Sequence, residues 1–304
     1  MAFEDKVVVT CALTGVLANR DQCPNIPYTP AEIGEDAKRA FDAGASVVHI
    51  HAREDDGSPT FDPKVFARIK DEVRKRSPII LNFSTGNLAK WPPEPNPGEK
   101  PEDTEDWKLM DQVVTYIREA RPEIAALNMG TMNYAKYSAK RKDFVFDMVF
   151  PNTYQKISHL LKAMNDAGVK PELECFDAGH TQGIWPLVDS GLLRKPLQFS
   201  FIVNVLGGIP PTVESVQLQK SLIPEGSQWE VIGISHCQWR MVATSLVLGG
   251  NIRVGLEDHL YLPDKQMAKH NGELVEHAVR MTRLVGREPA TVDEARQILG
   301  LRPP

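Results

Sequence analysis

The chain has 304 residues, of which 42% are apolar and 25% are charged, proportions that are ordinary for a soluble globular protein. Its formal net charge of −5 gives no reason to expect a nucleic acid or an acidic membrane as partner. No apolar run reaches the roughly 18 residues that a membrane span needs, and the acidic start, residues 1–6, is unlike a signal peptide. The four cysteines are scattered without a Cys-x-x-Cys pair, which fits a reduced, cytoplasmic protein.

Predicted strands and helices alternate through the first half of the chain. Thr29 reads as the N-cap of the first helix, with Pro30 at its first position and Glu32 completing a capping box. A Pro- and acid-rich stretch, 88–104, is predicted to be a long loop within one strand–helix unit, because the same alternation resumes after it. The strands predicted here are 7–13, 47–54, 79–85 and 124–129, and the helices are 30–43, one that begins at 63, and 107–120.

The same alternation continues to the C-terminus. The predicted strands are 171–177, 197–203, 229–234 and 252–258, and the predicted helices are 153–167, one near 185–190, one capped by Thr212, 238–248, 265–284 and one from Thr291. Strict alternation implies parallel strands with right-handed crossovers. Eight units in one chain of this length predict a closed (β/α)8 TIM barrel, a single domain over 1–304 with an additional C-terminal helix. The alternative is an open doubly wound sheet, but no Gly-x-Gly-x-x-Gly follows the first strand to favour it.

Two histidines lie on one face of the second predicted strand, because residues i and i+2 of a strand point the same way. In a closed barrel the second and eighth strands both flank the first, so Glu257 at the end of the eighth is within reach of His49 and His51. Two imidazoles and a carboxylate are a common catalytic Zn²⁺ set with an open position, and Fe²⁺, Mn²⁺ or Co²⁺ could use the same ligands. The alternatives are two histidines hydrogen-bonded to neighbours and an ion pair between Glu257 and Arg253.

Polar residues at other strand ends are candidates for binding a substrate. Ser84 and Thr85 follow the third strand and precede Gly86, an arrangement that suits backbone and hydroxyl binding of a carboxylate. A helix-capping turn is an equally good interpretation of these three residues. Asn128 ends the fourth strand, where it either contacts a ligand or orders the following loop.

Further strand ends supply candidates for acid–base chemistry and for a cofactor. Glu174 would lie inside the barrel, where a carboxylate needs a partner, and Arg253 could serve. Asp258, next to the candidate ligand, is the best general-base candidate; the alternative is a cap or turn residue. Gly207 and Gly208 after the sixth strand could admit a phosphate or pantetheine backbone, although a plain loop explains them as well.

Six short motifs are spread over nearly the whole chain. They are Ala-Leu-Thr-Gly at 12–15, Pro-Asn-Ile-Pro-Tyr-Thr-Pro at 24–30, His-Ile-His-Ala-Arg at 49–53, Ser-Thr-Gly at 84–86, Leu-Asn-Met-Gly at 127–130 and Arg-Val-Gly-Leu-Glu-Asp at 253–258. Each is weak alone, but together they closely resemble the β-keto acid cleavage enzyme family. The resemblance implies a zinc-containing (β/α)8 barrel, usually a homotetramer. It also implies an acyltransferase that converts a β-keto acid and acetyl-CoA to acetoacetate and a new acyl-CoA.

The resemblance assigns roles to residues by their place in these motifs. It implies that His49, His51 and Glu257 hold the metal. It also implies that Asp258 and Arg253 form the catalytic pair, with the aspartate taking the proton between the two carbonyls of the substrate.

Two further positions match the family, and three depart from it. The resemblance implies that Ser84 helps to hold the keto acid and that Glu174 supports the catalytic aspartate. Members that act on an aminated keto acid carry a glutamate where this chain has Leu17; the other departures are Ala126 for a threonine and His236 for an arginine. A leucine cannot pair with an ammonium group, so a neutral or apolar substrate tail is predicted. The alternative activities are a metal-dependent aldolase or C–C hydrolase that does not use CoA, and the alternative to an enzyme is an inactive barrel that serves as a scaffold.

Overall fold

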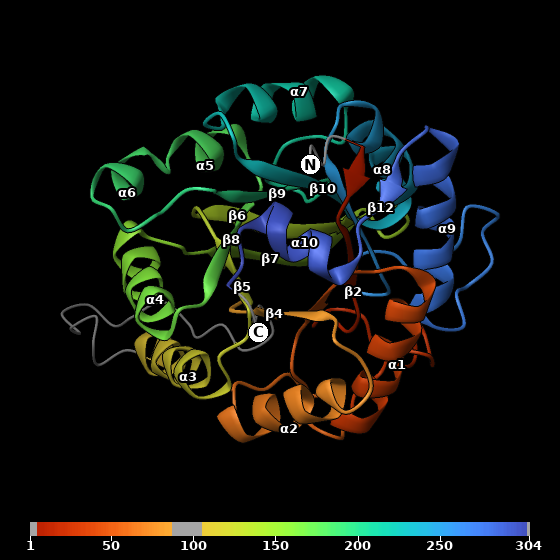
Figure 1. Cartoon of the computed structure of the whole chain (residues 1–304), viewed down its shortest axis with the longest axis horizontal. Helices are drawn as coiled ribbons and strands as arrows, with labels where there is room; N and C mark the ends of the chain where they lie inside the picture. Colours follow the sequence, from red (N-terminus) through yellow and green to blue (C-terminus); the bar gives the residue numbers. More distant parts are fainter. Residues whose placement is uncertain (1–4, 87–104, 303–304) are drawn as a thin grey trace.

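The computed structural model describes residues 5–86 and 105–302 and contains a closed barrel of eight parallel strands (Figure 1). Around the barrel the strands are β10 (Gln228–Gly233), β11 (Asn251–Val254), β2 (Val9–Ala12), β3 (Val47–Ile50), β4 (Ile80–Ser84), β5 (Ile124–Asn128), β8 (Lys170–Cys175) and β9 (Gln198–Val203). All eight predicted strands are present, most of them shorter than expected. The predicted (β/α)8 barrel is therefore confirmed, and the open doubly wound sheet was the wrong alternative.

The helices are α1 (Pro30–Ala43), α2 (Pro63–Arg74), α3 (Glu105–Ala120), α4 (Tyr154–Ala167), α5 (Ala178–Gln182), α6 (Trp185–Asp189), α7 (Val213–Leu222), the 3₁₀ helix η3 (Ser235–Cys237), α8 (Gln238–Val247), α9 (Asn271–Leu284) and α10 (Val292–Leu299). All of the α-helices except α10 surround the barrel as an outer ring (Figure 1). The capping box of Thr29 and Glu32 is formed as predicted. Helix α9 begins later than the predicted residue 265, because Tyr261 and Met267 form an antiparallel bridge instead of a helical turn.

Strand β4 illustrates how the two faces of the barrel wall are used. Phe83 points outward, where its ring lies 4.9 Å from the ring of Phe66 in α2, and Phe66 stacks at 3.8 Å on Tyr116 in α3. The alternate residues of β4, including Asn82, point into the barrel. Both faces of the sheet are buried, as expected for a parallel barrel wall covered by helices.

The C-terminal helix closes the amino-terminal end of the barrel. In Figure 1, α10 lies across the middle of the barrel. Ala295 and Leu299 of α10 join a core cluster with residues at or near the strand starts, namely Val8, Val47, Ile80 and Ile124. Strand β1 (Lys6–Val7) pairs in parallel with β12 (Glu288–Pro289) beside it. The predicted additional helix is therefore present, and it leaves the carboxyl ends of the strands for a functional site.

An antiparallel hairpin between β5 and α4 was missed. Its strands are β6 (Met132–Ser138) and β7 (Asp143–Phe150). The sequence analysis places no strand or helix between the predicted strand 124–129 and the predicted helix 153–167, although the apolar side chains at every second residue from Phe144 to Phe150 have the period of a strand. Tyr134 of β6 stacks at 5.8 Å on Phe146 and contacts Phe176, which follows β8, so the hairpin packs onto the carboxyl end of the barrel.

Some predictions fall outside this description. The predicted loop at 88–104 and the first four residues lie outside the described residues. Among the helices that the structure describes, none is both long and apolar enough to cross a membrane.

Candidate active site

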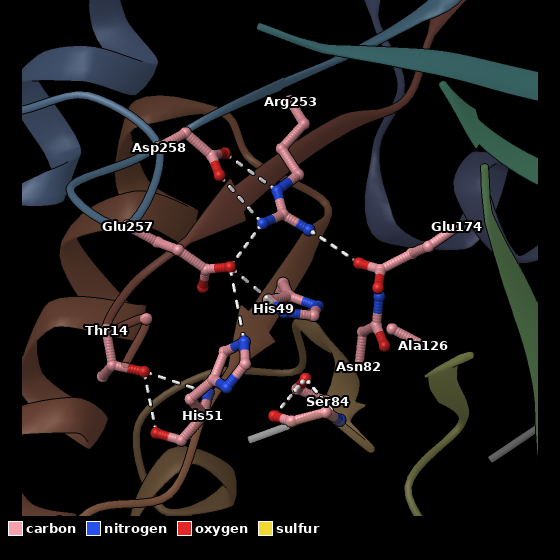
Figure 2. A network of polar contacts seen from close by, with 12 residues as sticks. Thr14, His49, His51, Asn82, Ser84, Ala126, Glu174, Arg253, Glu257 and Asp258 are labelled. Atoms are coloured by element: carbon pink, nitrogen blue, oxygen red, sulfur yellow. Dashed lines mark hydrogen bonds and ion pairs between the residues drawn. The ribbon is translucent and has the colours of Figure 1, made fainter. Parts of the chain in front are cut away.

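The three predicted metal ligands converge at the carboxyl end of the barrel (Figure 2). The Nε2 atoms of His49 and His51 lie 3.6 Å and 3.4 Å from Oε1 of Glu257. One ligand atom from each residue lies within 4.8 Å of the others. The barrel argument therefore placed the three correctly, but Glu257 comes from a turn, because β11 ends at Val254 and not at residue 258.

Unpartnered polar atoms in this cluster fit a divalent metal. Among the described residues, nothing forms a hydrogen bond with either ring nitrogen of His49 or with Oε2 of Glu257, and all three atoms are buried. Leaving buried polar atoms unpaired costs about 1–3 kcal/mol each, and such atoms are rare in folded proteins. The ion pair between Glu257 and Arg253 is also formed, at 2.6 Å, but it uses Oε1 and leaves Oε2 free. The donor set of two imidazoles and a carboxylate suits zinc and related ions.

The loop after β2 holds the ligands in place. The Thr14 hydroxyl donates to the carbonyl of His51 at 2.7 Å and accepts from its backbone N–H at 2.9 Å. Arg53 donates from Nε to the Gly15 carbonyl at 2.9 Å, which ties this loop to the segment after β3. Gly15 has φ +59°, and a Cβ there would lie 2.8 Å from Cγ of Glu257. A side chain at residue 15 would therefore displace the third ligand.

Arg253 contacts all three carboxyl groups of the site. Its Nε and Nη2 donate to the two carboxylate oxygens of Asp258, at 2.9 Å and 3.0 Å, in a bidentate pair. Its Nη1 lies 3.6 Å from Oε1 of Glu174 on β8. Figure 2 shows the guanidinium between Asp258, Glu257 and Glu174. The structure thus brings together the residues predicted as ligands and as acid–base groups.

Burial and neighbouring charges tune these groups differently. Burial, followed by the nearby Arg253 guanidinium, lowers the pKa of His49 well below its usual range, so the imidazole is neutral and able to bind a cation. Burial alone would raise the pKa of Glu257, but Arg253 and the histidines lower it well below its usual range. Burial raises the pKa of Asp258 to about 6 against the opposing effect of Arg253. Burial, reinforced by Glu172, raises the pKa of Glu174 to about 8.

A polar layer crosses the barrel interior beneath the site. Glu230 accepts from the Thr10 hydroxyl at 2.8 Å, and it lies 3.1 Å from the Ser200 hydroxyl. The same hydroxyl also contacts Glu172, which Asn82 contacts from the other side. Ser200 has one proton and cannot donate to both carboxyl groups. Both contacts are hydrogen bonds only if one of the two carboxyl groups carries a proton, which agrees with the raised pKa of Glu230, about 8, caused by burial and then by Glu172.

The layer predicts a pH-dependent stability. Because the pKa of Glu230 rises from 4.5 to about 8 on folding, unfolding releases a proton between these values. The stability contributed by this group is present below pH 4.5 and is lost as the pH rises toward 8, by up to about 1.4 kcal/mol per pH unit. We expect Glu230→Gln to flatten this slope, as measured by urea unfolding at pH 5, 6, 7 and 8.

The control for that measurement is Glu225→Gln, which changes an exposed carboxylate in a turn. In the control, the free energy of unfolding should change with pH as it does in the unaltered protein. An equal slope in Glu230→Gln would show that Glu230 is ionised in the folded protein over this range.

The cavity beside the ligands has an apolar wall of which the sequence analysis identified only Leu17. It has a volume of about 110 Å³ and is floored by His51, Glu174, Arg253, Glu257 and Asp258. The apolar residues that line it are Val16, Leu17, Tyr134, Phe150, Phe176, Ile202, Val205, Ile232 and Ile234. They come from the loop after β2, the hairpin and three separate strand ends, so no local sequence pattern contains them all. Only the alternation of apolar and polar residues in the hairpin could have indicated part of this wall.

The residues predicted to bind substrate are placed unevenly. Ser84, Gly86 and Asn128 line the cavity. The Ser84 hydroxyl accepts from the backbone N–H of Gly86 at 3.2 Å, and Oδ1 of Asn128 is buried with no hydrogen-bond partner in the part of the chain that the structure describes. Thr85 instead donates its hydroxyl to the Ala126 carbonyl at 2.5 Å. Thr85 therefore joins the ends of β4 and β5.

The two glycines predicted as cofactor contacts have a clear packing role. Gly207 has φ +101°, and a Cβ there would lie 2.0 Å from the carbonyl oxygen of Asn133 in the hairpin. A Cβ at Gly208 would lie 2.6 Å from the carbonyl oxygen of Phe176. Neither glycine is among the described residues that line the cavity. Their part in binding CoA stays a prediction.

Known proteins resemble this chain over almost its full length. The family model described as beta-keto acid cleavage enzyme matches residues 6–301. The 3-keto-5-aminohexanoate cleavage enzyme of Fusobacterium nucleatum is 36% identical over 299 residues, which cover 98% of this chain and 99% of that protein. The 3,5-dioxohexanoate:acetyl-CoA acetone transferase of Paraburkholderia graminis is 30% identical, with 99% and 98% covered. The apo structure of ObcA has the same fold, with a TM-score of 0.73 at 20% identity over 91% of this chain and 66% of that chain.

Proposed function

This chain belongs to the beta-keto acid cleavage enzyme family, and on that premise we propose that it is an acyltransferase acting on a β-keto acid and acetyl-CoA. The products are acetoacetate and a new acyl-CoA. The observation that carries the proposal is the cluster of His49, His51 and Glu257 directly beside the Arg253–Asp258 pair, at the mouth of the barrel. Active sites of this fold lie at that end.

The metal that we propose is Zn²⁺, with Fe²⁺, Mn²⁺ or Co²⁺ as alternatives. His49, His51 and Glu257 would hold it, and the neutral imidazole of His49 and the ionised Glu257 have the protonation states that ligands need. When bound, the ion would supply Lewis-acid polarisation of the keto and carboxylate oxygens of the substrate.

Asp258 is proposed as the general base. Its carboxylate would take a proton from the carbon between the two carbonyl groups of the keto acid. A pKa of about 6 suits this task, because the group is ionised at neutral pH and still basic enough to accept a proton. Arg253 holds both carboxylate oxygens and so fixes their orientation. Glu174 acts through Arg253 as a positioning residue.

The remaining cavity residues are proposed to bind and shield the substrate. The polar side of the cavity is formed by Ser84, Gly86 and Asn128, whose Oδ1 has no hydrogen-bond partner among the described residues. The apolar wall excludes water from the reacting carbon. Leu17 lies at the rim of the cavity with 51% of its surface exposed. Its side chain is uncharged, so it offers no partner to a charged substrate tail. These features support a neutral or apolar substrate tail.

The rim residue gives a test of the tail preference. We expect Leu17→Glu to raise kcat/KM for an aminated β-keto acid about fivefold relative to an uncharged one of the same length, because a partly exposed ion pair contributes up to about 1 kcal/mol. The measurement compares initial rates with the two keto acids.

Leu17→Gln is the matched control, because it adds a polar group of similar size without charge. The same change in preference with Leu17→Gln would show that polarity and not charge controls the tail. A preference of the unaltered protein for the aminated acid would contradict the proposed tail.

We further propose that the protein works as a cytoplasmic homotetramer. The four cysteines are all buried and none forms a disulfide, which is consistent with a reducing compartment. The tetramer is the usual assembly implied by the family resemblance.

A mass-spectrometric screen tests the proposed reaction. Metal-loaded protein is incubated with a panel of β-keto acids, with and without acetyl-CoA. The proposal predicts a new acyl-CoA and acetoacetate only when acetyl-CoA is present. Release of a free acid without acetyl-CoA would favour the aldolase or C–C hydrolase alternative.

A further inference from the structure

A second and larger cavity lies at the opposite, amino-terminal end of the barrel. It has a volume of about 460 Å³ and is bordered by the ends of α2, α3 and α4, the start of β8 and the helix α10. Lys170 at the start of β8 lines this cavity, and Glu174 lines the candidate active site. Glu174 lies four residue steps beyond Lys170 along the strand, a distance of about 13 Å. The cavity is therefore distinct from the candidate active site.

The charge of this cavity stands out against the rest of the chain. Eight lysine or arginine side chains line it, and Glu123 is the single carboxylate among the described residues that line it. The chain as a whole has a formal net charge of −5. Confining so many cations in one concave site is unfavourable unless something offsets their repulsion.

Contacts within the protein account for half of these cations. The ammonium of Lys70 donates to the last carbonyl of α3 at 2.5 Å, and Lys170 donates to a loop carbonyl at 2.5 Å. Such contacts to helix C-terminal carbonyls are favourable. Arg74 and Arg296 both bind Oε1 of Glu123, at 2.5 Å and 2.6 Å. The single carboxylate is therefore already shared by two guanidinium groups.

The other four cations have no anionic partner in the described part of the chain. They are Arg121, Arg194, Lys195 and Arg302. The side chain of Arg121 donates to the Arg118 carbonyl of α3, and no ion pair joins any of the four to a described carboxylate. Burial also lowers the pKa of Lys170 to about 8, which reflects a cation that its surroundings do not fully compensate. An anion from outside the protein would relieve both effects.

We propose that this cavity binds a small polyanion that carries two or more phosphate groups. A monovalent anion would offset one of the excess charges only, whereas linked phosphates offer several oxygen acceptors to the guanidinium groups at once. The volume lies within the range of small-molecule sites. Val169, Pro196 and Leu301 add apolar wall, which leaves room for an organic group beside the phosphates. Inorganic pyrophosphate, a nucleoside diphosphate and the phosphate end of a CoA molecule share this chemistry.

The first experiment is calorimetric titration of the full chain with pyrophosphate. Arg194→Gln with Lys195→Gln removes two unpartnered, exposed cations of the cavity. The matched control, Lys64→Gln with Arg68→Gln, removes two exposed cations of α2 that do not line it. We expect the cavity variant to weaken pyrophosphate binding about tenfold or more and the control to weaken it less than twofold. Equal weakening in both variants, or no binding by the unaltered protein, would overturn the proposal.

Titrations with other ligands identify which phosphate-containing molecule the cavity binds. Tighter binding of ADP than of pyrophosphate would indicate a nucleoside diphosphate, and a second CoA site that the cavity variant loses would indicate CoA. Orthophosphate should bind more weakly than pyrophosphate; equal binding would contradict the requirement for linked phosphates. Sedimentation of the cavity variant gives an independent check. A changed oligomeric mass together with no pyrophosphate binding would mean that a second copy of the chain covers the cavity, which would also overturn the proposal.

The proposed polyanion site and the proposed reaction can be tested independently of each other. The two substituted residues lie at the end of the barrel opposite the metal ligands. Acyl transfer measured with acetyl-CoA as the only polyanion should be unchanged in the cavity variant. Loss of this activity together with a normal fold would mean that the residues serve the main reaction and not a separate site.

Discussion

Replacing Asp258 by Asn is expected to lower kcat for acyl transfer by about a thousandfold while the metal stays bound. General bases contribute typically about 10²- to 10⁴-fold, and an amide cannot accept the proton. The side chain keeps its shape and can still contact the guanidinium of Arg253. The measurement combines the rate of acyl-CoA formation with metal content by elemental mass spectrometry.

Asp177→Asn is a matched control for that variant. Asp177 also follows a barrel strand, but it caps α5 by accepting from the Gly179 N–H at 2.9 Å, a task that asparagine performs equally well. The control should keep full activity. A normal kcat in Asp258→Asn would refute its role as the base, and loss of the metal in that variant would show that the aspartate belongs to the metal site.

Replacing Glu257 by Gln is expected to abolish both metal binding and turnover. Glutamine has the same shape but lacks the negative charge that makes a carboxylate a strong oxygen ligand of Zn²⁺. Changes outside the ligand shell already weaken metal binding by about 10- to 100-fold, so loss of a ligand should exceed that. The measurement is metal affinity by competition with a chromophoric chelator.

Thermal unfolding separates metal loss from misfolding. A bound ion stabilises only the folded state, so adding Zn²⁺ should raise the Tm of the unaltered protein and of Asp258→Asn. It should leave the Tm of Glu257→Gln unchanged. A metal affinity for Glu257→Gln equal to that of the unaltered protein would remove Glu257 from the ligand set.

The sequence was sufficient for the parts of the fold that follow local rules. Capping residues such as Thr29 and Thr291 mark where helices begin, and apolar runs of strand length mark the barrel wall. Barrel closure then placed His49, His51 and Glu257 together, because it makes distant strands neighbours.

Other features depend on contacts that no local pattern records. Strand β11 stops at Val254 because Gly255, at φ +150°, lies so close to Ala12 that a Cβ there would be 2.0 Å from its carbonyl oxygen. That approach turns the chain and presents Glu257 from a turn. The apolar wall of the cavity and the cationic cavity beside α10 likewise combine residues from separate segments. Their composition became visible only once the barrel had brought those segments together.

Isotope tracing tests the central claim most directly. Metal-loaded protein is incubated with an unlabelled β-keto acid and with acetyl-CoA labelled with ¹³C in its acetyl group. The masses of both products are then measured by mass spectrometry. The proposed reaction moves the labelled acetyl group into acetoacetate and leaves the new acyl-CoA unlabelled, since its acyl carbons come from the keto acid. Label that remains in acetyl-CoA while the keto acid is cleaved would contradict the account.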